Sequence, residues 1–106
     1  MKKQVFSMRD SIAEIYLPPF MMRTIGEATR ATLNSSKDPQ TYLHQSPNDY
    51  VLYQIATFDD LTGEYEMLED KKKIGSVAEM QAIANYERED AVNLKKHQDE
   101  TKQEIE

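Results

Sequence analysis

The sequence predicts a single α+β domain with a small, mainly antiparallel sheet of three or four strands and one helix packed on it. A C-terminal helix and a charged tail should follow. The length of 106 residues suits one domain with one small core. A run of aromatic and β-branched residues followed by a tight-turn signal predicts a hairpin, and two capping boxes predict two helices.

Residues 4 to 9 alternate in character and predict the first strand. Phe6 and Met8 would point to one face, and Ser7 and Arg9 to the other. Because successive strand residues point to opposite faces, this period of two is typical of a strand that is buried on one side only.

A turn and a return segment are expected next. Asp10 and Ser11 predict the turn, because both side chains can bond nearby backbone N–H groups. Residues 13–17 should be extended again. The proline pair at 18 and 19 removes two backbone donors and therefore predicts an edge or linker segment, which Phe20 would anchor.

The first helix is predicted over residues 25–35. Thr24 and Glu27 form a capping box, in which a hydroxyl and a carboxylate each accept a free N–H at the helix start. The apolar stripe is thin and made largely of small side chains, so the helix should lie close to the sheet. The stripe comprises Ile25, Ala28, Ala31 and Leu33.

A second, very short helix is expected after residue 37. Asp38 would be its N-cap and Pro39 its first residue, since proline has no N–H to leave unpaired there. One or two turns would reach Leu43, before Pro47 ends the segment.

The strongest strand signal covers residues 50–58, which are rich in aromatic and β-branched residues and apolar on both faces, so this strand should lie centrally. The acidic loop 59–63 carries a glycine suited to a left-handed position, and a partner strand over 64–68 completes a hairpin. The lysine run 71–73 is interpreted as a solvated loop.

A second capping box, Ser76 with Glu79, opens the C-terminal helix. Apolar residues then recur at helical spacing at Val77, Met80, Ala84, Ala91 and Leu94. We divide the chain into a compact domain over 1–80 and a charged helical extension with a disordered tail over 81–106. Residues 96–106 hold one large apolar side chain, so truncation after Lys95 should leave stability almost unchanged.

Composition narrows the class of protein. There is no cysteine, which excludes disulfides and thiolate metal sites and favours a cytosolic protein. No apolar run approaches the ~18 residues that a membrane span needs, and the N-terminus has no signal-peptide pattern.

Charge is distributed unevenly along the chain. The net charge is −6, yet the first 37 residues hold six basic and three acidic side chains, while residues 38–70 hold eight acidic and no Lys or Arg side chains. A negative total therefore does not exclude a basic face that attracts polyanions.

No catalytic, metal or phosphate-binding pattern is present, so we expect a protein that is not an enzyme and has no cofactor. Asp59 and Asp60 beside Thr62 are the residues that a hairpin turn favours, in preference to a cation site. His44 and His97 are far apart and have no carboxylates at zinc-ligand spacing.

Aromatic and basic residues are interleaved in the first third of the chain, which is the pattern of a platform for single-stranded nucleic acid. The candidate DNA-binding residues are Lys2, Lys3, Arg9, Tyr16, Phe20, Arg23 and Arg30. The alternative, which the spacing alone favours, is that Tyr16 and Phe20 anchor the core and the arginines are solvated.

Several blocks of sequence occur in the order found in one viral family. They are Val5–Ser11, Ala13–Phe20, Gly26–Ala28 with Arg30, Pro47–Tyr50 with Leu52–Ile55, and Phe58–Gly63. Over residues 1 to 80 the chain resembles the small nonstructural protein of gokushovirus-type microviruses, phages with single-stranded circular DNA genomes. Ile12 departs from the lysine found in similar proteins, and Ala56-Thr57 replaces a glycine that often precedes the hairpin.

The resemblance implies a protein in the cytoplasm of the infected bacterium that binds single-stranded DNA or assists genome synthesis and packaging. Its partners would be that DNA and viral or host replication or packaging proteins, without a membrane. The alternative function is a protein-interaction factor that binds a viral or host protein through the acidic hairpin without touching DNA. Because the folded part is small and sheet edges are often covered by a symmetry mate, we also expect a homodimer.

Overall fold

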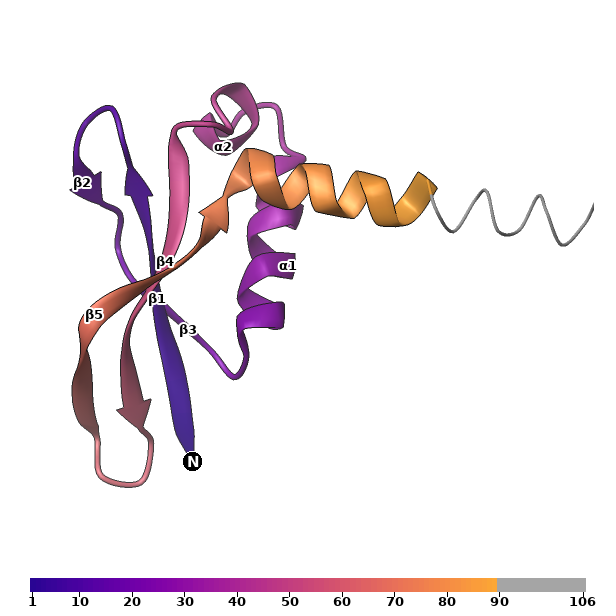
Figure 1. Ribbon diagram of the computed structural model, residues 1–106. Coiled ribbons are helices and arrows are strands. Elements are labelled where there is room, and N and C mark those ends of the chain that lie inside the picture. Colours follow the sequence, from indigo (N-terminus) through magenta and orange to yellow (C-terminus); the bar gives the residue numbers. More distant parts are fainter. Residues whose placement is uncertain (90–106) are drawn as a thin grey trace, which may run out of the picture.

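The computed structural model describes residues 1–89, which form one curled antiparallel sheet with helices on one side (Figure 1). Five strands pair in the order β2-β1-β4-β5, with β3 beside β1. The predicted α+β class with a mainly antiparallel sheet is confirmed. The strands are β1 (Lys2–Asp10), β2 (Ile15–Tyr16), β3 (Phe20–Met22), β4 (Tyr50–Asp59) and β5 (Glu64–Ser76).

Three helices accompany the sheet. They are α1 (Ile25–Ser36), the four-residue α2 (Tyr42–Gln45), and a C-terminal helix over 77–89, the last residues that the structure describes. The predictions for Ala91, Leu94 and the tail 96–106 lie outside these residues.

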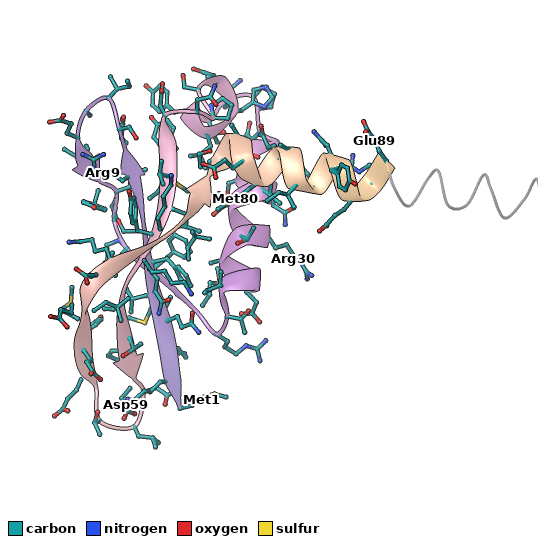
Figure 2. The ribbon with its side chains drawn as sticks, in the orientation of Figure 1. Met1, Arg9, Arg30, Asp59, Met80 and Glu89 are labelled. Carbon is teal, nitrogen blue, oxygen red and sulfur yellow. The ribbon has the colours of Figure 1, made fainter. Side chains whose placement is uncertain are left out.

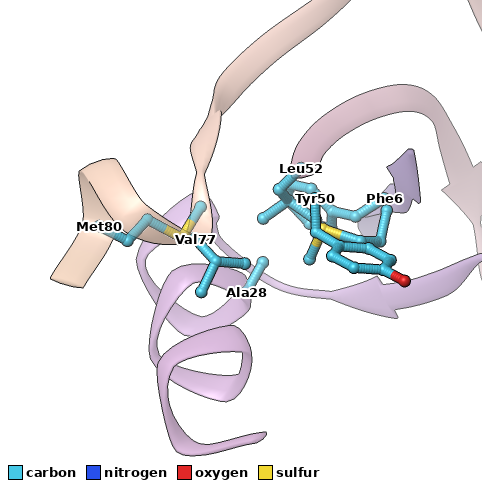
Figure 3. Packing of buried hydrophobic residues seen from close by; sticks show 7 residues of the cluster. Phe6, Ala28, Tyr50, Leu52, Val77 and Met80 are labelled. Carbon is cyan, nitrogen blue, oxygen red and sulfur yellow. The ribbon is translucent and has the colours of Figure 1, made fainter. Parts of the chain in front are cut away.

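The core lies where α1 and the C-terminal helix meet the sheet (Figure 3). Phe6 and Met8 of β1 are neighbours of Gln54 and Leu52 on β4. The buried cluster comprises Phe6, Met8, Ala28, Tyr50, Leu52, Val77 and Met80. Ala28 has no exposed surface, so its small side chain allows α1 to approach the sheet closely.

β1 is buried on both faces, and the prediction of a strand with Ser7 on a solvent face is wrong. Ser7 is 1% exposed. The chain between β2 and β3 runs beside this part of β1, and the Ser7 hydroxyl donates to the Leu17 carbonyl oxygen at 2.7 Å. The return segment predicted over 13–17 is extended only at Ile15–Tyr16, because residues 11–14 form the turn.

The buried side of α1 also differs from the apolar stripe that the sequence predicts. Ala28, Thr32 and Ser36 are buried, while Leu33 is only partly buried. The two hydroxyl groups tolerate burial because Thr32 Oγ1 donates to the Ala28 carbonyl and Ser36 Oγ donates to the Leu33 carbonyl, at 2.9 and 2.7 Å.

Both predicted capping boxes hold their helices, in two different ways. Ser76 and Glu79 bond reciprocally, as predicted: Glu79 N–H donates to Ser76 Oγ and Ser76 N–H donates to Glu79 Oε1. At α1, Glu27 N–H donates to Thr24 Oγ1, but the Glu27 carboxylate accepts from Arg23 N–H, one residue earlier than predicted.

The short helix starts later than predicted. Asp38 caps a turn, accepting the Gln40 N–H at 2.9 Å, and Thr41 is the N-cap of α2. Thr41 takes that place because its hydroxyl accepts from His44 N–H, while Pro39 and Gln40 remain in the turn.

The hairpin forms where predicted, but its second strand is longer. β5 runs to Ser76, so the run 71–73 lies in a strand and the loop interpretation is wrong. β5 pairs with the ten-residue β4 over residues 64–67 and again from Lys72 to Ser76, and the irregular pairing between Gln54 and Ala56 accommodates the β5 residues between these stretches. Lysines are common on such edge strands because they oppose pairing with another chain.

Candidate functional site

Two aromatic rings and three basic side chains gather on the face of the sheet opposite α1. We call this group the sheet cluster: Arg9, Tyr16, Tyr53, Lys71 and Lys73. The Tyr16 ring has two cations near it, with Arg9 Cζ 5.9 Å and Lys71 Nζ 5.6 Å from its centroid. Tyr53 meets Tyr16 edge to face, with centroids 5.9 Å apart.

Strand register brings these residues together. Arg9 lies opposite Tyr16, and Tyr53 lies opposite Lys73. Arg9 and Tyr53 each adjoin a core residue, Met8 or Leu52, so they point away from α1. Figure 2 shows Arg9 at the end of β1 near β2, on the side of the sheet away from α1.

The turn beside the cluster is locked by Asp10, as the sequence predicts. Its carboxylate accepts the N–H groups of Ile12 and Ala13 at 3.0 and 3.1 Å, and Glu14 has a positive φ of 59°. The Tyr50 hydroxyl donates to the same carboxylate at 3.4 Å. Burial, and then the charge of Asp10, raise the pKa of Tyr50, so this hydroxyl keeps its proton.

The cluster retains accessible charge and ring surface. Tyr16 is 44% exposed. Lys73 forms an exposed ion pair with Glu79 at 3.9 Å, whereas Arg9 and Lys71 have no carboxylate partner among the residues described. An exposed ring flanked by cations can stack on a nucleobase while the cations face phosphates.

The other predicted site residues lie elsewhere. Lys2 pairs with Glu66 at 3.7 Å, and Lys3 lies opposite Phe58, so both are at the hairpin end of β1. Phe20 stacks on Phe6, with centroids 5.8 Å apart, and is part of the packing around the core.

The two arginines of the α1 region also lie away from the sheet cluster. Arg23 binds Glu27 at 2.9 Å, and this hydrogen bond is the main cause that lowers the pKa of Glu27. Arg23 follows Met22, the residue paired with Gln4, so it is about 20 Å from Arg9 along β1. Arg30 lines a groove on α1. The seven candidates therefore do not form one path.

Residues 3–80 match the model of a family described as Phage ORF5 protein. The chain belongs to this family. No curated protein and no solved structure matches the chain.

The sequence did not predict three residues of the sheet cluster as site residues, namely Tyr53, Lys71 and Lys73. The predicted hairpin could have indicated them. If the strand over 50–58 pairs with a second strand that extends past residue 68, the lysines at 71–73 come to lie beside Tyr53. Because residues 71–73 were interpreted as a loop, the sequence did not predict that these lysines lie beside Tyr53.

At the far end of the hairpin, the Asp59 carboxylate bonds within the turn, whereas the Asp60 carboxylate binds the Met1 amino group at 2.7 Å. Asp59 Oδ1 accepts Leu61 N–H at 2.9 Å, and Gly63 takes a left-handed φ of 73°. Across residues 1–89, no group of three His, Asp or Glu side chains is arranged to hold a metal, and no helix is long and apolar enough to cross a membrane.

Proposed function

We propose that this protein is a nonenzymatic accessory of a microvirus-type phage that binds single-stranded DNA through the sheet cluster. It would act in the host cytoplasm during synthesis or packaging of the viral genome. The observation that supports the proposal is the exposed Tyr16 ring with Arg9 and Lys71 near it. Base–aromatic stacking contributes about 1–3 kcal/mol per base and tolerates any sequence.

The cluster offers few phosphate contacts, which sets the expected affinity. Each contact with single-stranded DNA contributes a slope of about −0.7 to the log–log dependence of binding on salt, so three cations allow about −2. A monomer would bind weakly. We propose that a homodimer doubles this surface, and light scattering that gives the monomer mass at high micromolar concentration would rule the dimer out.

Fluorescence anisotropy with a labelled oligodeoxythymidylate, at several salt concentrations, tests DNA binding. Tyr16→Ala should lose one stacked base, and Lys71→Glu should weaken binding roughly tenfold or more. Lys72→Glu is the matched control, since Lys72 lies opposite Gln54 and points away from Tyr53. The proposal fails if the wild type shows no salt-dependent binding at low ionic strength, or if Lys71→Glu and Lys72→Glu weaken oligonucleotide binding equally.

A second candidate is binding of a viral or host protein through the hairpin. Leu61, Tyr65 and Met67 are exposed there among acidic side chains, which suits a partner with basic and apolar groups. Replacing all three by Ser should abolish co-purification of such a partner from infected cells after nuclease treatment. Retention of the partner would exclude the hairpin as its binding surface.

A further inference from the structure

A groove of about 540 Å³ lies between α1, α2 and the C-terminal helix. Figure 2 shows Arg30 projecting from α1 on the side where the C-terminal helix extends. The residues that line the groove are Arg30, Leu33, Asn34, Ser36, Lys37, His44, Gln81, Ala84, Asn85 and Arg88.

The groove is locally basic in a chain of net charge −6. Arg30, Lys37 and Arg88 line it, and no carboxylate does. None of these three side chains forms an ion pair within residues 1–89. Like charges that converge in this way repel one another, and a bound anion would relieve the repulsion.

The C-terminal end of α1 explains the position of only one of these three cations. Cations often lie near a helix C-terminus to complement its free carbonyl groups. Here the Asn34 carbonyl accepts Lys37 N–H, Ser35 accepts Asp38 N–H, and Ser36 accepts the His44 ring at 2.9 Å. Arg30 also lies in the middle of α1 and Arg88 on another helix, so only Lys37 is placed to complement the helix end.

The neutral side chains point to a ligand larger than a simple anion. Asn34 and Asn85 offer amide donors and acceptors of the kind that read a base edge, and Leu33 and Ala84 add apolar surface. Gln81 Nε2 donates to Ser36 Oγ at 3.3 Å, which leaves the Gln81 carbonyl oxygen and a second N–H for a ligand. The His44 Nδ1 donates to the Ser36 carbonyl, which leaves Nε2 for a ligand. The volume is in the range of small-molecule sites.

We propose that this groove binds a nucleotide, with the three cations on its phosphate and the amides on its base. The site is separate from the sheet cluster, because α1 packs against the opposite face of the sheet. Its occupation therefore does not depend on the DNA binding proposed above.

The test is a titration of the full chain with thymidine 5′-monophosphate, followed by amide NMR shifts. Saturable shifts should appear around 30–37 and 81–88, with no response to thymidine and at least several-fold weaker binding of inorganic phosphate. Arg30→Gln with Arg88→Gln should weaken binding at least tenfold. Arg23→Gln, an exposed arginine on the same side of the sheet but outside the groove, should leave it unchanged.

Three results would overturn the proposal. They are no saturable shift at the groove, equal loss in the Arg23→Gln control, and phosphate binding as tight as that of the nucleotide. Lys71→Glu separates this site from the sheet cluster, since it should leave nucleotide binding intact even where it abolishes oligonucleotide binding. The spectra of each variant report directly whether it is folded.

Discussion

At one end of the sheet, β1 and β4 are covered by α1 and the C-terminal helix, whereas at the other end the β4–β5 hairpin extends with no helix over it (Figure 1). The covered end holds the buried cluster around Phe6 and Leu52. The hairpin end has the Phe58–Tyr65 ring pair, at 4.8 Å, and the exposed Lys2–Glu66 ion pair. Exposed ion pairs add at most about 1 kcal/mol to the free energy of unfolding, so most of the stability should come from the covered end. Recognition of charged ligands should take place on the exposed surfaces.

The largest effect is expected from a leucine at the covered end. Leu52 is fully buried and Leu61, in the hairpin loop, is 85% exposed. Leu52→Ala should lower the free energy of unfolding by about 2–5 kcal/mol, because it removes buried contacts and leaves a cavity. Leu61→Ala should change it by less than about 0.5 kcal/mol. Urea denaturation measures the free energy of unfolding of both variants. Equal losses would show that the covered end contributes no more to stability than the hairpin end.

A cap at the covered end should matter less than the core. Ser76→Ala removes the acceptor of Glu79 N–H and should cost about 1 kcal/mol. Ser35, which is exposed on α1, is the control, and Ser35→Ala should stay within about 0.5 kcal/mol. A negligible effect of Ser76→Ala on the urea midpoint would show that packing of Val77 and Met80 alone holds the helix start.

The hairpin turn should be about as sensitive as this cap. Gly63 has φ +73°, and an added Cβ would meet no atom within 4 Å, so Gly63→Ala carries only conformational strain. A left-handed φ costs a residue with a Cβ about 1–2 kcal/mol, and the loss should lie near the lower value because the tip can open without exposing the core. Amide exchange should rise only near residues 59–64. If Gly63→Ala lowered the free energy of unfolding as much as Leu52→Ala does, the hairpin would have to unfold cooperatively with the core.

The smallest effect concerns two carboxyl groups, one on α1 and one at the hairpin. The pKa of Glu27 is lowered by Arg23, and that of Asp60 by the Met1 amino group at 2.7 Å. A lowered folded-state pKa stabilises the protein above the ordinary pKa of the group, and the contribution is lost as pH falls through the lowered value. Arg23→Gln should raise the pKa of Glu27 and leave that of Asp60 lowered, as a carbon-detected NMR titration would show. A parallel rise at Asp60 would mean that the two ends are coupled.

Local signals in the sequence predicted much of the fold. The strand over 50–58, the turn at 59–63 and both helix starts are where the sequence places them, because propensity, capping and turn chemistry act over about four residues. The same reasoning misplaced the start of α2, since Asp38 and Thr41 are both good caps and the competition between them depends on the surrounding contacts.

By itself, the sequence determined which segments form strands and helices, and how unevenly the charges are spread. Only the tertiary structure decided which side chains meet. Ser7 is buried beside the segment that joins β2 to β3, Tyr16 meets Lys71 although their strands β2 and β5 are not paired, and Arg30 and Arg88 line one groove although they lie on different helices. These pairs are separated by many residues, and their proximity depends on strand register and helix packing, which no local pattern in the chain encodes.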